Sequence, residues 1–123
     1  MNSRSLGKAI SECDIQASIV DYLEIMAAQC GLLFFSVPNE GIDRANPARL
    51  AKLKRMGFRS GVSDLVIVKA GRAYFLEVKR PGESQRGSQV DFEADAGRVE
   101  APYAVAWSFE DALEILRKWK LVP

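Results

Sequence analysis

Two runs of β-branched and aromatic residues, joined by a short turn, constrain the fold of this chain more than any other feature. Residues 62–68 and 73–79 flank a Lys-Ala-Gly-Arg turn at 69–72, and this pattern predicts a β-hairpin. If the loop is symmetric, with an even number of residues, Asp64 faces Glu77 across the two strands. A loop with an odd number of residues would change the parity and separate these carboxylates.

Asp64, Glu77 and Lys79 are predicted to share one face of the hairpin. Side chains alternate along a strand, so Glu77 and Lys79 point to the same side and Val78 points to the other. Like charges directly opposite one another are destabilising, which favours a compensating cation. Two carboxylates beside a lysine suit Mg²⁺ or Mn²⁺, an ion that can activate water for attack on a phosphodiester. The alternative is a solvated hairpin with scattered charges.

The composition excludes several kinds of active site. The 123-residue chain contains no histidine and two cysteines, which excludes zinc sites and nucleophiles activated by a histidine. Cys13 and Cys30 fall at opposite ends of one predicted helix, too far apart for a disulfide, and we expect both to be small core residues. The net charge is only +1, so binding to nucleic acid would depend on a local basic patch.

The length fits one domain. Hydrophobic residues make up 48% of the chain and charged residues 27%, which is typical of soluble globular proteins. Neither a membrane span nor a signal peptide is apparent. We therefore expect a flexible tail at residues 1–10, a single domain at residues 11–123 and a cytoplasmic location.

The first predicted helix begins at Ser11, where Asp14 completes a capping box, and ends at Gly31. Its apolar stripe consists of Ile15, Ile19, Tyr22, Leu23, Met26 and Cys30. Glu12 continues this stripe at the first turn. It either interacts with the helix dipole or reaches the rim of the site formed by Asp64 and Glu77.

A second helix is predicted to start at Asn46-Pro47, with Leu50, Leu53 and Met56 facing inward. It lies in a basic run that contains no acidic residue and that is either a solvated face or a surface for phosphates. The run consists of Arg44, Arg49, Lys52, Lys54, Arg55 and Arg59.

Gly57 and Gly61 bracket Phe58-Arg59-Ser60, a flexible connection in which Ser60 is a further candidate contact for nucleic acid. Glycine before Asp64 either lets a nucleic-acid backbone approach closely or serves only as a turn.

The remaining elements complete an α/β pattern. Residues 32–37 and 101–108 are predicted strands, and residues 87–98 and the segment capped by Ser108 are predicted helices. After the first of these strands, Asn39 and Glu40 either line a site or form a turn. The order α-β-α-β-β-α-β-α predicts a mixed central sheet flanked by helices in one domain.

These motifs together resemble the VRR-NUC domain of the PD-(D/E)xK nuclease superfamily, which has a restriction-endonuclease-like core. The resemblance covers nearly the whole chain, and its specificity comes from an ordered set of motifs, since Glu-x-Lys alone is weakly specific. The set consists of Glu12, Pro38-Asn39-Glu40-Gly41, residues 57–64, Phe75-Leu76-Glu77-Val78-Lys79 and Gln89.

The resemblance implies a role for each residue of the site. Asp64 and Glu77 would bind Mg²⁺ or Mn²⁺ together with the main-chain carbonyl of Val78, and Lys79 would orient or activate the attacking water. Glu12 would complete the acidic cluster and act as a further ligand. Gln89 would support the site, although Arg86-Gly87-Ser88 precedes it where the family usually has a Ser-Pro-like helix start.

The resemblance also implies an activity. Small stand-alone members, as in phages and bacteria, look like homodimeric endonucleases that act on branched DNA such as four-way (Holliday) junctions and leave a 5′-phosphate, and the expected compartment is the cytoplasm of a bacterial or phage-infected cell. Two alternatives remain open: a restriction-type or end- and flap-processing nuclease on linear duplex, and a non-catalytic nucleic-acid-binding module.

Overall fold

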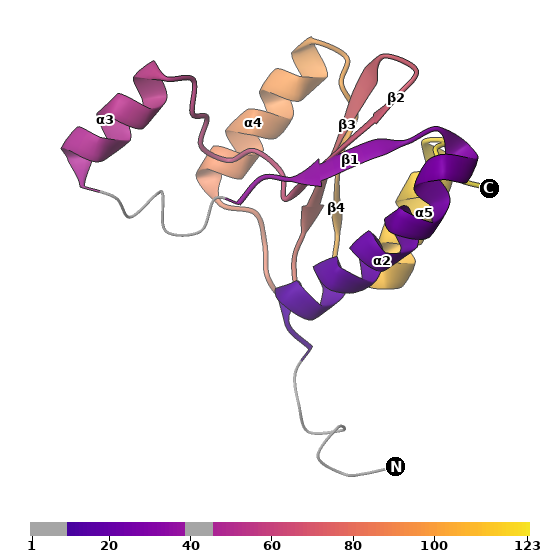
Figure 1. Cartoon of the computed structure of the whole chain (residues 1–123). Helices are drawn as coiled ribbons and strands as arrows, with labels where there is room; N and C mark the ends of the chain where they lie inside the picture. Colours follow the sequence, from indigo (N-terminus) through magenta and orange to yellow (C-terminus); the bar gives the residue numbers. More distant parts are fainter. Residues whose placement is uncertain (1–9, 39–45) are drawn as a thin grey trace.

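A mixed β-sheet with helices on both faces forms the centre of the computed structural model, which describes residues 10–38 and 46–123 (Figure 1). In this part of the chain the sheet has four strands in the order β1-β2-β3-β4. The elements are α2 (Glu12–Cys30), β1 (Leu33–Ser36), α3 (Pro47–Arg55), β2 (Leu65–Lys69), β3 (Arg72–Val78), α4 (Gly87–Arg98), β4 (Tyr103–Ala106) and α5 (Phe109–Lys118). This order confirms the predicted α/β fold.

Several sequence-based expectations lie outside the described residues. They are the tail, apart from Ile10, and the candidates Asn39, Glu40 and Arg44.

The predicted hairpin is confirmed. Strands β2 and β3 pair antiparallel, with Val66 opposite Phe75 and Val68 opposite Ala73. The loop between them consists of Ala70 and Gly71, whose φ angles are 50° and 80°, and two successive positive φ angles are what a type I′ turn requires. Because this loop has an even number of residues, Asp64 and Glu77 fall at opposing positions of the two strands, as the predicted site requires.

Strand β1 pairs antiparallel with β2, and β4 pairs parallel with β3. Helices α2 and α5 cover one face of this sheet and α4 lies on the other (Figure 1).

The core lies between the sheet and the helices α2 and α5. Local signals define α2: Ser11 Oγ accepts a hydrogen bond of 3.0 Å from Asp14 N, and Gly31 ends the helix with a φ of 69°. The largest fully buried side chains are Ile15, Ile19, Leu23, Leu65, Ile67, Leu76, Val78, Leu116 and Leu121. Cys30 packs against this core, but Cys13 is exposed because it lies outside the apolar stripe, so its predicted burial is wrong.

Helix α3 lies apart from the sheet (Figure 1). Its predicted start is confirmed, since the Asn46 side chain accepts a hydrogen bond of 2.8 Å from Arg49 N. The prediction that its apolar residues face inward is wrong for Met56, which follows the helix and is 75% exposed. Leu50 and Leu53 are half-buried, and no residue of α3 is fully buried. None of the described helices combines the length and the hydrophobicity needed to cross a membrane.

Replacing Ile19 by alanine tests the core. Ile19 is fully buried, so Ile19→Ala should lower the free energy of unfolding by about 2–5 kcal/mol, measured by urea denaturation. Ile25 on the same helix is 65% exposed, and Ile25→Ala should change the same quantity by less than about 0.5 kcal/mol. Equal losses from the two variants would contradict the described packing of α2.

Candidate active site

The candidate site lies where β2 begins and β3 ends. Asp64 immediately precedes β2, and its main-chain carbonyl accepts a hydrogen bond of 2.9 Å from Val37 N, beyond the end of β1. Lys79 immediately follows β3, and its main-chain N–H donates to Ala106 O at 2.9 Å. The outer strands thus continue their pairing past the hairpin and hold the main chain of both residues.

The hairpin brings the carboxyl groups of Asp64 and Glu77 together. The paired residues of the two strands end at Leu65 and Leu76. One residue further, Asp64 Oδ2 accepts a hydrogen bond of 2.7 Å from Val78 N, and the Asp64 and Glu77 carboxyl groups come within hydrogen-bonding reach of each other. The two acids therefore meet where the hairpin register predicts.

Glu77 is the most constrained group of the site, with only 2% of its surface exposed. Its Oε2 accepts a hydrogen bond of 2.7 Å from Gln89 Nε2 and lies 3.6 Å from Lys79 Nζ. Its Oε1 is buried without a hydrogen-bond partner. An unsatisfied buried acceptor costs about 1–3 kcal/mol, and more when it is charged, so this oxygen favours a bound proton or cation.

The pKa of Glu77 is raised to about 8, first by burial and then by the negative charge of Asp64, while the charge of Lys79 lowers it. The pKa of Asp64 is also raised by burial, against the hydrogen bond from Val78 N that lowers it. When Glu77 is protonated it donates a hydrogen bond to Asp64, which stabilises the Asp64 carboxylate. Without a cation, the two acids thus favour a single negative charge.

Gln89 reaches the site from the first turn of α4. Its Oε1 accepts a hydrogen bond of 2.8 Å from Arg86 N, while its Nε2 donates to Glu77. This pair of bonds fixes both ends of the amide. The structure therefore places Gln89 against Glu77 although the Ser-Pro-like helix start is absent.

Glu12 lies at the start of α2, on the rim of the site. Its pKa is raised to about 7, mainly by burial and by a hydrogen bond with Glu83. The charge of Asp64 also raises this pKa, whereas the charge of Lys79 lowers it. No pattern in the sequence indicates Glu83, because this residue lies in the segment after β3 and meets Glu12 only through the tertiary fold.

The donor set fits a hard divalent ion. Within residues 10–38 and 46–123, no three side chains of the types His, Cys, Asp and Glu converge as metal ligands. Mg²⁺ often binds through one or two carboxylates and keeps several waters, and the unpartnered Oε1 of Glu77 is an available ligand atom. Asp64 and Glu77 are thus the residues that would hold such an ion, whereas Glu12 and the carbonyl of Val78 stay predicted ligands.

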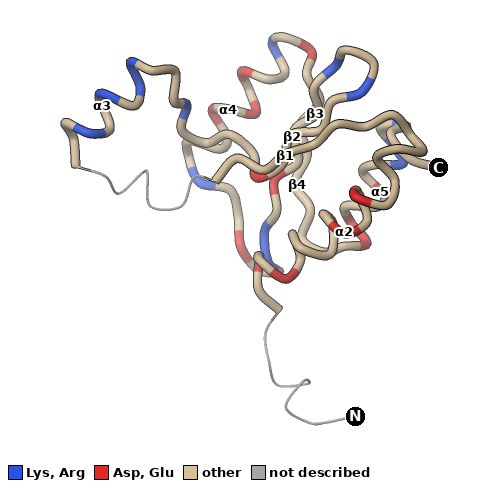
Figure 2. The backbone as a smooth tube through the Cα atoms, in the orientation of Figure 1, with Lys and Arg blue, Asp and Glu red and all other residues tan. Residues whose placement is uncertain are grey.

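The candidate nucleic-acid contacts divide into two groups. Helix α3 carries lysines and arginines and no acidic residue (Figure 2), and its exposed basic side chains are Arg49, Lys52, Lys54 and Arg55. Arg59, in contrast, forms an ion pair with Asp95 and lies over the ring of Phe92, 5.4 Å from its centroid. Ser60 is half-buried in the connection that follows.

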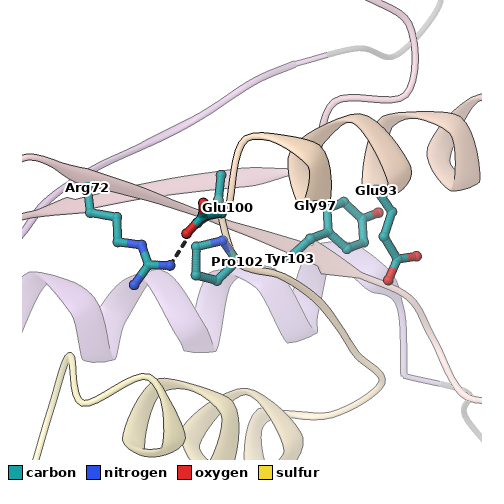
Figure 3. A pocket seen from close by; sticks show the side chains of 7 residues that line it. Arg72, Glu93, Gly97, Glu100, Pro102 and Tyr103 are labelled. Carbon is teal, nitrogen blue, oxygen red and sulfur yellow. Dashed lines mark hydrogen bonds between the residues drawn. The ribbon is translucent and has the colours of Figure 1, made fainter.

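Two hollows flank β3. One has a volume of about 480 Å³ and is lined by Ile10 and by the residues that directly follow Lys79, which are Arg80, Pro81, Gly82 and Glu83. The other, of about 300 Å³, lies at the opposite end of β3 and is lined by Arg72, Glu93, Gly97, Glu100, Ala101, Pro102 and Tyr103 (Figure 3). None of the predicted site residues lines this second hollow, in which Arg72 donates a hydrogen bond of 2.7 Å to Glu100 O.

Comparison with solved structures identifies the fold. A structure described as a VRR_NUC domain protein matches with a TM-score of 0.72 and 19% identity, over 94% of this chain and 93% of the other. This chain has the VRR-NUC fold. A second structure with this fold, described as a VRR_NUC domain, matches with a TM-score of 0.56 and 19% identity, over 89% of this chain and 97% of the other. No family model and no curated protein matches the sequence, so the VRR-NUC assignment depends on three-dimensional shape.

The protonation of Glu77 predicts how the stability of this VRR-NUC fold changes with pH. Glu77 keeps its proton up to a pKa of about 8 in the folded chain, against 4.5 as the ordinary value. Between these values the folded state binds more protons, so without divalent ions the free energy of unfolding should fall as pH rises, by at most about 1.4 kcal/mol per pH unit for one proton. Urea denaturation from pH 5 to 9 in the presence of a chelator measures this slope.

Glu77→Gln is the matched variant, because its neutral amide preserves the shape of the side chain. It should reduce the slope, and the slope that remains should come from Glu12, whose pKa is raised to about 7, and from Asp64, whose pKa is also raised by burial. An unchanged slope in Glu77→Gln would contradict the assignment of the proton to Glu77.

Proposed function

We propose that this protein is a divalent-metal-dependent DNA endonuclease that hydrolyses phosphodiester bonds. The single observation that carries the proposal is the state of Glu77 in a VRR-NUC fold: a buried carboxyl group beside Asp64, with one oxygen lacking a hydrogen-bond partner. A purely structural role would favour an apolar side chain here, because burying two acids together is costly. A cation site explains the cost, and the fold suggests nucleic acid as the substrate.

The side chains of the site can divide the work of hydrolysis among them. A divalent ion, when bound, would supply an activated water and stabilise the charge on the phosphate. Asp64 is oriented by Val78 N and Glu77 by Gln89, so neither carboxylate needs to reorganise. Lys79, close to Glu77 and almost buried, is suited to hold the attacking water or a phosphate oxygen. We place Glu12 at the rim as a further acidic group of the site.

Helix α3 is the proposed contact for the phosphate backbone. It carries cations without acids and lies apart from the carboxylates of the sheet (Figure 2). Phosphate contacts supply most of the sequence-independent affinity for DNA, which is the kind of affinity a structure-selective enzyme needs. We add Arg44, Arg59 and Ser60 to this contact as predicted on the sequence.

We further propose that the enzyme acts on branched DNA such as four-way junctions and works as a homodimer. Each chain contributes one candidate site, and symmetric cleavage of two strands requires two sites, which a dimer with two-fold symmetry supplies. The expected product carries a 5′-phosphate.

Cleavage assays test the activity. Synthetic four-way junctions, flaps, nicked duplexes and linear duplexes are incubated with Mg²⁺, Mn²⁺ or a chelator. Glu77→Ala and Lys79→Ala should each lower the cleavage rate by roughly 10²-fold or more, as expected for groups that act on the reacting atoms. Glu93→Ala and Lys118→Ala, at exposed positions on α4 and α5, serve as controls and should retain the activity.

The outcomes separate the proposed activities. Paired symmetric nicks in the junction, with a dimeric mass in light scattering, support a junction resolvase, whereas preferred cleavage of flaps or linear duplex supports an end-processing or restriction-type enzyme. Metal-independent binding without any cleavage would identify a non-catalytic binding module. Full activity in either alanine variant would refute the assigned roles.

Replacing basic residues of α3 by alanine tests the proposed contact between this helix and the phosphate backbone of DNA. The double variant Lys52→Ala/Arg55→Ala should weaken binding to duplexes of different sequence to a similar extent, because phosphate contacts do not depend on sequence. The slope of log K against log[salt] should fall by about 0.9 for each phosphate that the protein no longer neutralises, measured by fluorescence anisotropy. The control Lys118→Ala/Lys120→Ala removes the same charge at the end of α5, and an equal effect there would mean that the attraction is not local to α3.

A further inference from the structure

The connection between α3 and β2 presses against the first turn of α4. Gly61 is buried and has a φ of 83°. A Cβ atom at this position would overlap the carbonyl group of Ser88 and would lie 2.8 Å from Gln89 N. Both the backbone conformation and the space therefore require glycine.

The same connection is anchored further along α4. Arg59, two residues before Gly61, forms an ion pair with Asp95, and its guanidinium lies 5.4 Å from the centroid of the Phe92 ring. A cation over an aromatic face adds roughly 0.5–1 kcal/mol at an exposed site. The connection thus follows α4 from Ser88 to Asp95 and is held at both ends of that stretch.

The contact of Gly61 lies next to the residue that binds Glu77. Gln89 follows Ser88, and its side chain donates the 2.7 Å hydrogen bond to Glu77 Oε2. A shift of the Ser88 carbonyl moves the backbone of Gln89, and a hydrogen bond of this length does not tolerate a displacement of an ångström. The position of the Glu77 carboxyl group therefore depends on how closely the connection approaches α4.

We propose that Gly61 is a positioning residue that seats the first turn of α4, so that Gln89 orients Glu77 for metal binding. Arg59 and Asp95 hold the connection in this place. The consequence for catalysis depends on the proposed nuclease function, but the link from Gly61 through Gln89 to Glu77 does not. Removing a partner that orients a metal ligand typically weakens metal affinity by about 10–100-fold.

Gly61→Ala is compared with Gly57→Ala in the whole chain. Gly57 lies in the same connection with a φ of 101°, and a Cβ atom there would meet nothing within 4 Å. Both variants carry the strain of alanine at positive φ, and only Gly61→Ala adds the collision with Ser88. The difference between them isolates the seating of α4.

Two readouts that need no DNA report the result. The side-chain NH₂ signal of Gln89 is followed by ¹⁵N NMR in metal-free protein, assigned by its disappearance in Gln89→Ala, and Mn²⁺ affinity is measured by electron paramagnetic resonance. Gly61→Ala should move the Gln89 signal to the position of a solvated amide and weaken Mn²⁺ binding roughly tenfold. Gly57→Ala should leave both nearly unchanged. Equal behaviour of the two variants would overturn the proposal.

Two further variants keep the test decisive. In a Gln89→Ala background, Gly61→Ala should weaken Mn²⁺ binding by less than about twofold, because effects that travel through one residue do not add. Full additivity would show that Gly61 acts by another route. If Gly61→Ala does not fold, Asp95→Asn loosens the connection without a collision, and it should shift the Gln89 signal and weaken Mn²⁺ binding several-fold. An unchanged Gln89 signal in Asp95→Asn would overturn the proposal.

The wild-type protein separates this proposal from the proposed function. If it neither binds Mn²⁺ nor cleaves DNA, the nuclease assignment fails. The Gln89 signal still decides whether Gly61 positions Gln89 against Glu77.

Discussion

Mutual repulsion of two buried carboxyl groups is the constraint around which this molecule is arranged. Asp64 and Glu77 lie next to each other at the end of the hairpin, and burial is the largest cause that raises the pKa of both. Three groups from different parts of the fold stabilise the two acids. The main-chain N–H of Val78 donates a hydrogen bond to Asp64, the side-chain amide of Gln89 on α4 donates one to Glu77, and Lys79 forms an ion pair with Glu77. The hairpin, α4 and the parallel strand β4 are all needed to deliver them.

The asymmetry of charge follows from the same arrangement. The chain as a whole is nearly neutral, yet the acids that meet in the site come from the sheet and α2, while α3 carries cations only. Because α3 lies apart from the sheet (Figure 1), its lysines and arginines are not used to neutralise the buried acids. A polyanion could therefore meet a positive surface and an acidic centre on one small domain.

The parts of the structure that could be predicted from the sequence depend on local signals: helix caps and the alternation of side chains along a strand. The capping residues Ser11, Asn46 and Ser108 act within a few residues of themselves, and all three cap as expected. The hairpin register needed only side-chain alternation and an even loop. The fold class followed from the order of these elements.

The errors have a common physical origin. Periodicity showed that α3 has an apolar side, but it could not show that the described helices and strands leave Met56 at its end exposed. The expected burial of Cys13 came from its residue type, but this residue lies off the stripe that α2 buries and is exposed. The hydrogen bond between Glu12 and Glu83 and the ion pair between Arg59 and Asp95 join segments that are far apart in the sequence. Local sequence patterns cannot predict such contacts.

The tight bend at Ala70 and Gly71 limits how the length of this chain can vary. One amino acid added or removed there would turn β3 over, so that Leu76 and Val78 would leave the core and Glu77 would enter it. Insertion or deletion of single codons at this point should therefore be far more damaging than most replacements of either residue. Variation in length is better accommodated between β1 and β2, where the chain already makes a long excursion through α3.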